Sequence, residues 1–260
     1  MITCSGEELQ VSNKAVANDR VDVLEHLYQK YRSFATGSES GWLLTFRYWR
    51  KKYAWMAVTR GARFLKRLID IIGSLFALML FSPIYLIVGL LIKLSDGGPI
   101  LYWQIRIGQF GREFQFPKFR SMTIDADSLN IVLMPLNQHK EGITFKLKHD
   151  PRITWIGKII RRFSIDELPQ LWCVLIGDMS LVGPRPPLPR EVSQYTLKDR
   201  RRLEVIPGLT CIWQVSGRAD IPFPKQVELD MQYIESQSLW LDIKILLQTI
   251  PAILNGKGAY

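Results

Sequence analysis

Cysteine and histidine are scarce in this sequence, with three residues of each type among 260. Cys4, Cys173 and Cys211 lie far apart, and no pair of Cys or His residues has the spacing of zinc ligands. An odd number of scattered cysteines fits a reducing compartment better than a disulfide-stabilised secreted domain. The sequence therefore predicts neither a zinc site nor a disulfide framework.

Two common nucleotide-binding signatures are also missing, namely the Walker A loop and the GxGxxG turn. There is no internal repeat and no low-complexity run. The first ten residues, MITCSGEELQ, are polar and acidic, so we expect no signal peptide. Any nucleotide must be bound without the usual glycine-rich loops.

Acidic residues are absent from Gly41 to Arg67, where Lys and Arg alternate with aromatic residues such as Trp42 and Trp55. The whole chain carries a formal charge of +10, which predicts an anionic partner such as nucleic acid, anionic lipid or a phosphorylated substrate. Interleaved aromatics and cations are typical of a helix in the lipid headgroup layer. A basic linker without a specific contact is the alternative interpretation.

One long apolar run, Ile71 to Ile92, contains 22 residues and no charge, which is enough to span a bilayer. A buried core helix is rarely apolar on every face. The run is interrupted by Ser82 and Pro83, and Pro83 cannot donate a hydrogen bond to the Met79 carbonyl. We expect the Ser82 hydroxyl to bond back to Leu78, a contact that bends helices.

Cations flank this run on both sides, which is awkward for a single crossing under the positive-inside rule. Each arm has about eleven residues, or roughly 16 Å of helix, close to half of a hydrocarbon core of roughly 30 Å. The residues alone leave two structures open, a re-entrant hairpin and a kinked single span. The flanking cations are Arg60, Arg63, Lys66 and Arg67 before the run and Lys93, Arg106 and Arg112 after it.

The remaining sequence predicts a mixed fold. The periodicity of residues 21–34 predicts a short amphipathic helix, and residues 100–108 and 113–122 predict two strands joined through the turn GQFG. Residues 157–175 have helical periodicity interrupted by Pro169, whereas the prolines of residues 179–189 exclude a regular helix. The apolar residues 238–254 predict a helix that packs in the core or lies against a membrane.

The adjacent acids Asp166 and Glu167, in SIDELPQ, are the strongest candidates for chemistry. Such a pair is usually a solvated surface cluster, but apolar neighbours here predict partial burial. Arg161 and Arg162 precede it and would keep a carboxylate ionised. An ionised carboxylate beside cations can attack phosphorus or hold Mg²⁺.

Two further motifs offer fixed cations, namely KFRSM with Lys118 and Arg120, and GPRPP with Arg185. Arg185 lies between two prolines, so its backbone is stiff, which suits bidentate binding of a phosphate. Each motif is weak by itself, because every protein surface carries Lys and Arg.

Taken together and in order, several motifs resemble the bacterial sugar transferase family, the monotopic phosphoglycosyl transferases that begin glycan synthesis on polyprenyl phosphate. The resemblance covers residues 64–260 and rests on KRLIDIIGSLFALMLFSPIYLIV, KFRSM, SIDELPQLW, GDMSLVGPRP, PGLTCIWQVSGR, ELDMQYI and SLWLDIKILLQTI. It implies a predominantly helical α+β fold, in which a re-entrant membrane hairpin precedes a compact catalytic domain with a small β element and amphipathic interfacial helices.

The resemblance divides the chain into four segments. Residues 1–40 are a polar extension, 41–70 a basic aromatic membrane-interface segment, 71–92 a re-entrant hairpin bent at Ser82-Pro83, and 93–260 the catalytic domain. It also implies that the protein lies at the cytoplasmic face of the bacterial inner membrane, among anionic lipids.

For the chemistry, the resemblance implies that Asp166 is the nucleophile and Glu167 its partner, with both also near Mg²⁺. Asp166 would attack the β-phosphate of a UDP-sugar and release UMP, and undecaprenyl phosphate would then accept the sugar phosphate. The sugar is expected to be glucose or galactose, and no nucleic acid is expected as a partner. Cationic positions of the family motifs match Lys118, Arg120, Arg161, Arg185 and Arg218, and a further motif position matches Asp230.

Three residues depart from the usual family pattern, namely Cys173, Cys211 and Pro187. Cys211 stands where glycine is common, so a positive φ at that position would shift the loop that carries Arg218. Two other functions remain as alternatives, a catalytically inactive scaffold and a basic membrane-tethered module that binds anionic lipid or nucleic acid.

Overall fold

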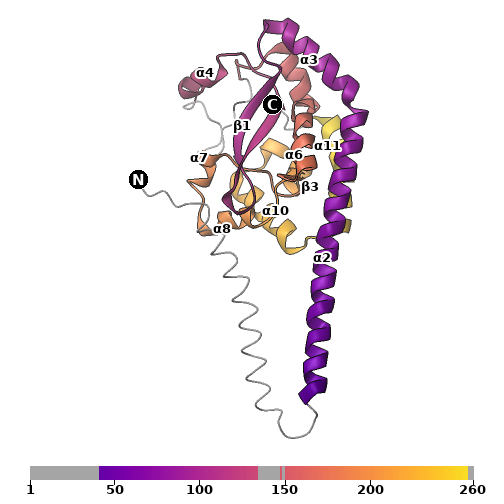
Figure 1. Cartoon of the computed structure of the whole chain (residues 1–260). Helices are drawn as coiled ribbons and strands as arrows, with labels where there is room; N and C mark the ends of the chain where they lie inside the picture. The colour runs from indigo at the N-terminus through magenta and orange to yellow at the C-terminus, as the bar shows by residue number, and fades with distance from the viewer. Residues whose placement is uncertain (1–40, 134–146, 148–149, 257–260) are drawn as a thin grey trace. The chain divides into compact units, whose positions relative to one another are not determined.

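The computed structural model describes residues 41–133, 147 and 150–256, so the helix predicted for residues 21–34 lies outside the described part. The chain divides into two compact units, Met1–Lys66 and Arg67–Tyr260. The described residues confirm a predominantly helical α+β fold with two small two-stranded sheets (Figure 1). The four segments predicted from the sequence remain a prediction.

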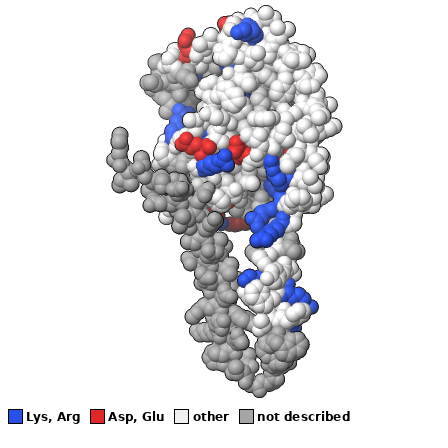
Figure 2. Space-filling model, viewed as in Figure 1, with Lys and Arg blue, Asp and Glu red and all other residues white. Residues whose placement is uncertain are grey.

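The long helix α2 (Gly41–Leu80) begins in the first unit and continues into the second. Its part in the first unit is basic, and Figure 2 shows Lys and Arg side chains gathered along it. Trp49 stacks on Tyr53, with ring centroids 5.5 Å apart, and the Lys52 ammonium lies 4.8 Å from the Trp49 ring centroid. Aromatic and cationic side chains therefore interleave on the helix surface, as their spacing in the sequence indicated.

A sharp bend separates α2 from α3 (Ser82–Asp96), because residues 60–80 and 82–96 are inclined by 57°. The Ser82 hydroxyl donates to the carbonyl of Met79 over 2.8 Å. The predicted acceptor, Leu78, was wrong for a physical reason. Pro83 has no N–H, so the Met79 carbonyl loses its helical donor, and the Ser82 hydroxyl takes that place.

No single helix among the described residues is both long and apolar enough to cross a membrane, although the bent pair passes that test by length and composition. One face of the pair is buried within the second unit. The Asp70 carboxylate accepts hydrogen bonds from the Ser180 hydroxyl at 3.0 Å and the Leu181 amide at 2.9 Å. Large apolar side chains remain exposed on both arms, including Leu75, Phe76, Met79 and Leu80 of α2 and Leu86, Ile87, Leu90 and Leu94 of α3.

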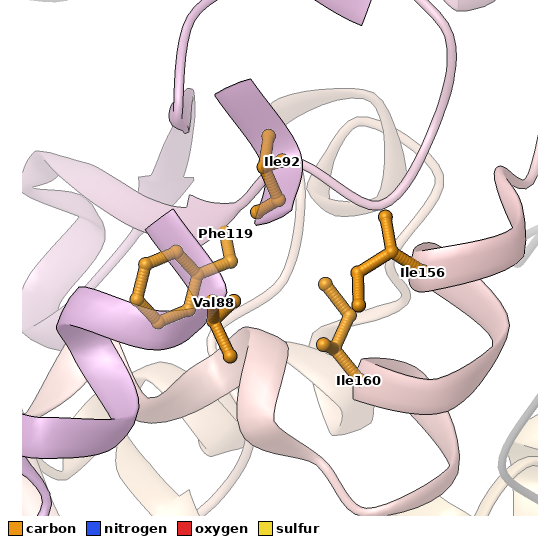
Figure 3. Close-up of a cluster of buried hydrophobic side chains, with 5 residues drawn as sticks. All are labelled: Val88, Ile92, Phe119, Ile156 and Ile160. Carbon is orange, nitrogen blue, oxygen red and sulfur yellow. The ribbon is translucent and has the colours of Figure 1, made fainter. Parts of the chain in front are cut away.

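The two predicted strands are present as β1 (Leu101–Ile107) and β2 (Glu113–Phe119), which form an antiparallel hairpin. Figure 3 shows the core cluster that joins this hairpin to its neighbours. Val88 and Ile92 of α3 pack with Phe119 of β2 and with residues of α5 (Trp155–Arg162). Helix α3 and the strand that carries Lys118 therefore share one core.

The second sheet pairs β3 (Ser180–Val182) with β4 (Gly208–Thr210) in parallel. The backbones at Gly183 and Gly208 touch so closely that a Cβ on Gly208 would lie 2.0 Å from the Gly183 nitrogen. Only glycine fits there. This contact fixes the backbone at the start of the proline-rich segment that carries Arg185.

Short elements and two longer helices complete the second unit. The last helix packs Ile245 in the core and leaves Trp240, Leu247, Ile250 and Leu254 exposed, so an apolar face remains uncovered opposite the packed one. The bounds are α4 (Ala126–Leu133), α6 (Leu171–Ile176), α7 (Pro189–Val192), α8 (Leu197–Arg200), α9 (Ile212–Ser216), α10 (Phe223–Glu235) and α11 (Leu239–Asn255), with 3₁₀ turns η1 (Gln109–Gly111), η3 (Ile165–Gln170), η4 (Arg201–Glu204) and η5 (Arg218–Asp220).

The cluster of Figure 3 gives a matched test of the core. Ile160 is 1% exposed, whereas its neighbour Ile159 on the same helix is 46% exposed. Ile160→Ala is expected to lower the free energy of unfolding by about 2–5 kcal/mol, because it leaves a cavity. Ile159→Ala is expected to change it by no more than about 0.5 kcal/mol. Chemical unfolding in detergent measures both, and equal effects would contradict this packing.

Candidate active site

A tight turn presents the two acids. The helix α5 ends at Arg162, and Ser164 then adopts a left-handed conformation with φ of 54° before the 3₁₀ turn η3 begins. The interruption that the sequence placed at Pro169 thus occurs five residues earlier, because Pro169 is accommodated within the 3₁₀ turn. The Tyr85 hydroxyl of α3 donates to the Leu168 carbonyl at 2.6 Å and ties this turn to the bent helix pair.

Glu167 is held between two cations. Its Oε1 accepts a hydrogen bond from the Arg185 guanidinium at 2.6 Å and from the Lys118 ammonium at 3.2 Å. Burial alone would raise the pKa of Glu167, but Arg185 and Lys118 outweigh burial and hold it well below its usual range. Glu167 therefore stays ionised at every physiological pH.

Asp166 is in a different environment, although it is the next residue. It is buried, and none of the described residues forms an ion pair with it. Burial raises the pKa of Asp166, the Lys118 charge opposes that rise, and the Glu167 carboxylate adds to it. The two acids are thus electrostatically unequal, with one clamped and one unpaired.

A cavity of about 730 Å³ opens beside the acids. The structure brings seven of the sequence-predicted residues to its wall, namely Asp166, Glu167, Lys118, Arg120, Arg161, Arg185 and Arg218. Such a concentration of cations around two carboxylates suits a ligand with several negative charges, such as a diphosphate.

These cations differ in the hydrogen bonds and ion pairs that they already form. Arg120 forms an ion pair with Asp96, and Arg161 donates to the Ser121 hydroxyl at 2.8 Å. Burial lowers the pKa of Arg218, while the charges of Glu167 and Asp166 oppose that shift, so Arg218 interacts electrostatically with both acids. Arg218 and Arg161 keep guanidinium donors available for an anion, and the buried Arg120 Nη1 has no hydrogen-bond partner among the described residues.

Asp230 is not among the residues that line the cavity. It is fully buried on α10 and pairs with Arg202, whose Nη2 lies 2.7 Å from the Asp230 Oδ2. Burial raises the pKa of Asp230 to about 6, against the opposing effect of Arg202. The structure therefore places Asp230 behind the cavity wall, with Arg202 between it and the cavity.

Sequence reasoning missed several wall residues, above all Arg106, Tyr195 and Arg202. Burial lowers the pKa of Arg106 to about 10, and its Nη1 donates to the Pro186 carbonyl at 3.0 Å. Arg106 had been grouped with the cations that flank the apolar run, and KDRRRLE around Arg202 has the composition of a solvated surface. No local pattern distinguished either residue.

The three departures from the family pattern are accommodated. Cys211 has φ of −150°, so its position needs no left-handed conformation, and the expected shift of the Arg218 loop has no structural basis. The Cys173 thiol donates to the Gln115 carbonyl at 3.4 Å. The Pro187 carbonyl accepts a hydrogen bond from the Ile107 amide at 2.9 Å, which anchors the segment after Arg185 to β1.

Comparison with known proteins gives a consistent result. A sequence model of the bacterial sugar transferase family matches residues 61–256. Galactosyl transferase CpsE of Streptococcus agalactiae is 48% identical over 75% of this chain and 43% of its own length. Undecaprenyl-phosphate galactose phosphotransferase of Salmonella typhimurium is 43% identical over 77% of this chain and 43% of its own length.

This chain therefore spans less than half the length of those two relatives. A shorter relative, exopolysaccharide production protein ExoY of Rhizobium meliloti, is 40% identical over 75% of this chain and 88% of its own length. The chain belongs to the bacterial sugar transferase family, as its motifs predicted.

The unequal acids give a test of the site by titration. In Glu167→Gln the pKa of Asp166 is expected to fall, because a negative neighbour is removed and Lys118 and Arg185 are released from it. In Lys118→Met the pKa of Asp166 is expected to rise, because a positive neighbour is lost. Carbon-13 NMR of labelled carboxyl groups measures both shifts, and a rise in Glu167→Gln would contradict the proposed electrostatics.

Proposed function

We propose that the protein transfers a sugar 1-phosphate from a UDP-sugar to undecaprenyl phosphate and releases UMP. The observation that carries this proposal is the unpaired, buried Asp166 beside the clamped Glu167, in a cavity lined with cations. The names of similar proteins support it, because one relative is called an undecaprenyl-phosphate galactose phosphotransferase and another a UDP-galactose-lipid carrier transferase.

The reaction consists of two displacements at the same phosphorus. An Asp166 carboxylate oxygen attacks the β-phosphorus of the donor, the bond to the oxygen that bridges the two phosphates breaks, and UMP departs with the electron pair. An oxygen of the polyprenyl phosphate then attacks the aspartyl phosphosugar. The Asp166 carboxylate is regenerated, and the product is a polyprenyl diphosphate sugar.

The contacts of the site support separate roles for its charges. Glu167 keeps Lys118 and Arg185 in place and cannot itself attack, because both cations stabilise its charge. Arg161 and Arg218 have donors free for the diphosphate, whose negative charge grows on the leaving UMP. Arg120 pairs with Asp96 through Nη2, and its Nη1 would be a further donor for the diphosphate.

Mg²⁺ fits this donor set as a shared ion. The described residues contain no group of three or more His, Cys, Asp or Glu side chains that would hold a metal alone. Mg²⁺ is commonly bound through one or two carboxylates together with substrate phosphates, and Asp166 and Glu167 are the carboxylates that would hold it. When bound, it neutralises charge on the diphosphate.

The same proposal assigns the bent helix pair to a re-entrant membrane hairpin, with both ends on the cytoplasmic side of the inner membrane. Support comes from the 57° bend, the exposed apolar side chains of both arms and the basic surface of α2 (Figure 2). Anionic lipids would meet that basic surface. The Tyr85 contact with η3 would keep the catalytic turn close to the lipid acceptor.

Galactose is the leading donor sugar, because the names of three relatives mention it, with glucose as the other hexose to test. The product would begin exopolysaccharide, capsule or O-antigen synthesis, in line with the exopolysaccharide production named for another relative. An inactive scaffold or a lipid- or nucleic-acid-binding module would need no unpaired carboxylate in the cavity.

Release of UMP tests the proposed reaction. Asp166→Asn is expected to lower the rate of UMP release by at least about a thousandfold, because the nucleophile is lost. Asp178→Asn is the matched control, since Asp178 lies outside the cavity wall. Purified protein in detergent is given UDP-galactose or UDP-glucose, undecaprenyl phosphate and Mg²⁺, and EDTA is expected to stop the reaction.

Without the acceptor, label from the sugar is expected to stay covalently attached to the wild-type protein and not to Asp166→Asn. An Asp166→Asn protein that kept full activity would exclude the aspartyl intermediate.

The membrane arrangement is tested by accessibility. A tag before residue 1 and a tag after residue 260 are both expected to be protected from an impermeant reagent in intact bacteria and labelled after lysis. Both ends of a re-entrant hairpin face the cytoplasm, whereas a single span separates them. Labelling of one tag alone in intact cells would establish a crossing and overturn the hairpin.

A further inference from the structure

The proposed chemistry leaves one part of the cavity unused. Its wall there contains Tyr195, Trp213, Phe223 and Gln226 together with Arg202, and we refer to these five residues as the aromatic end. The Tyr195 and Phe223 ring centroids are 5.6 Å apart. The Arg202 guanidinium carbon lies 5.7 Å from each of these two ring centroids.

Arg202 is buried in this wall, and one of its hydrogen-bond donors is unpaired among the described residues. It is only 5% exposed, and its Nη1 donates to the Tyr195 hydroxyl at 3.0 Å while Nη2 pairs with Asp230. Its Nε has no hydrogen-bond partner among the described residues. A buried donor left unpaired is costly, so an acceptor from a ligand would complete the set.

The charge of this end is balanced, in contrast to the surroundings of the acids. Asp230 neutralises Arg202 from behind, and the other wall residues are neutral. A second phosphate would gain little here, whereas a neutral molecule with hydroxyl groups and an apolar face would fit. Apolar walls with a few placed polar groups are typical of sites for small organic ligands.

The position relative to the acids decides which part of the donor belongs here. Cys211 lies within electrostatic reach of both Arg185 and Arg202, so the aromatic end adjoins the cations around Glu167. Trp213 lies on α9, directly before the η5 turn that carries Arg218. In a UDP-sugar, the group attached to the attacked phosphorus is the sugar, while uridine lies one phosphate further away.

We propose that the aromatic end binds the sugar ring of the donor and determines which sugar the protein accepts. This inference rests on the proposed phosphoglycosyl transfer. The C–H face of a hexose packs on the aromatic rings, and its hydroxyls pair with Arg202 Nε and with the Gln226 side chain. A site that hydrogen-bonds hydroxyl groups discriminates strongly between sugars that differ in one of them.

Two substitutions test this assignment while keeping both charged groups, Arg202 and Asp230, although Phe223 packs on Arg202 and Trp213 lies against Asp230. Trp213→Phe replaces the indole by a smaller ring. Phe223→Leu removes the second ring but keeps an apolar contact with Tyr195 and Val227. Lys225→Gln is the matched control, because Lys225 is exposed on the same helix α10 and pairs with Glu228. Thermal unfolding in detergent verifies that each variant is folded.

The measurement is kcat/KM for UDP-galactose, UDP-glucose and UDP-N-acetylgalactosamine, together with the inhibition constant of UDP, which lacks the hexose. In at least one of the two variants, the ratio of kcat/KM between two sugars is expected to change by about tenfold, equivalent to about 1.4 kcal/mol. The inhibition constant of UDP is expected to stay within about twofold of the wild-type value. Lys225→Gln is expected to change neither.

The other outcomes overturn the inference in distinguishable ways. If UDP inhibition weakens by the same factor as the sugar kinetics, the aromatic end binds uracil instead. If folded variants lose rate equally for all three sugars, the end has only a structural role. A wild-type protein that releases no UMP would overturn the proposed function and this inference with it, whereas an active wild type with unchanged ratios in both variants overturns this inference alone.

Discussion

The clamp of Glu167 between Lys118 and Arg185 is the interaction on which the site depends. It joins three segments that are distant in sequence, namely strand β2, the turn η3 and the proline-rich segment after β3. A buried carboxylate with two cationic partners is stable only while both remain in place, since removing one partner leaves an uncompensated charge. Both carboxylates line the cavity, and the clamp leaves Asp166 as the one without an ion-pair partner among the described residues.

Burial of the clamp requires a rigid frame, and the frame comes from the bent helix pair. Val88 and Ile92 of α3 pack on Phe119, next to Lys118, and the Tyr85 hydroxyl binds the turn that carries both acids (Figure 3). The bend at Ser82-Pro83 thus has a structural consequence apart from any membrane. It directs α3 onto the hairpin and α5 within the second unit. The other arm, α2, is bound through hydrogen bonds from Ser180 and Leu181 to the Asp70 carboxylate.

Local sequence patterns predicted the helices and strands better than they predicted the tertiary contacts of individual side chains. The β1–β2 hairpin and the burial of the acid pair could be predicted, because turn residues and apolar neighbours act within a few positions. The break in the helix before the acids was placed at Pro169, five residues too late. The acceptor of the Ser82 hydroxyl was misassigned to Leu78, four residues earlier. Because Pro83 has no N–H, the carbonyl left without a helical donor is that of Met79, three residues before Ser82. Arg202 and Arg106 escaped notice because their burial depends on contacts with residues far along the chain, such as Asp230 and Pro186. Asp230 was found by resemblance alone, and its place behind the wall depends on tertiary packing.

The electrostatic gradient along the cavity gives the site a direction. Around the acids, the four cations Lys118, Arg161, Arg185 and Arg218 outnumber the two carboxylates, whereas Arg202 at the aromatic end is matched by Asp230. A donor that placed its phosphates at the aromatic end would leave the excess of positive charge around the acids without a matching anion. Interactions between charges are stronger in the low dielectric of a buried wall. The charged part of a ligand would therefore be directed towards Asp166 and the neutral part away from it. Orientation of the donor would therefore be set by charge, and selection of the sugar by shape and hydrogen bonding.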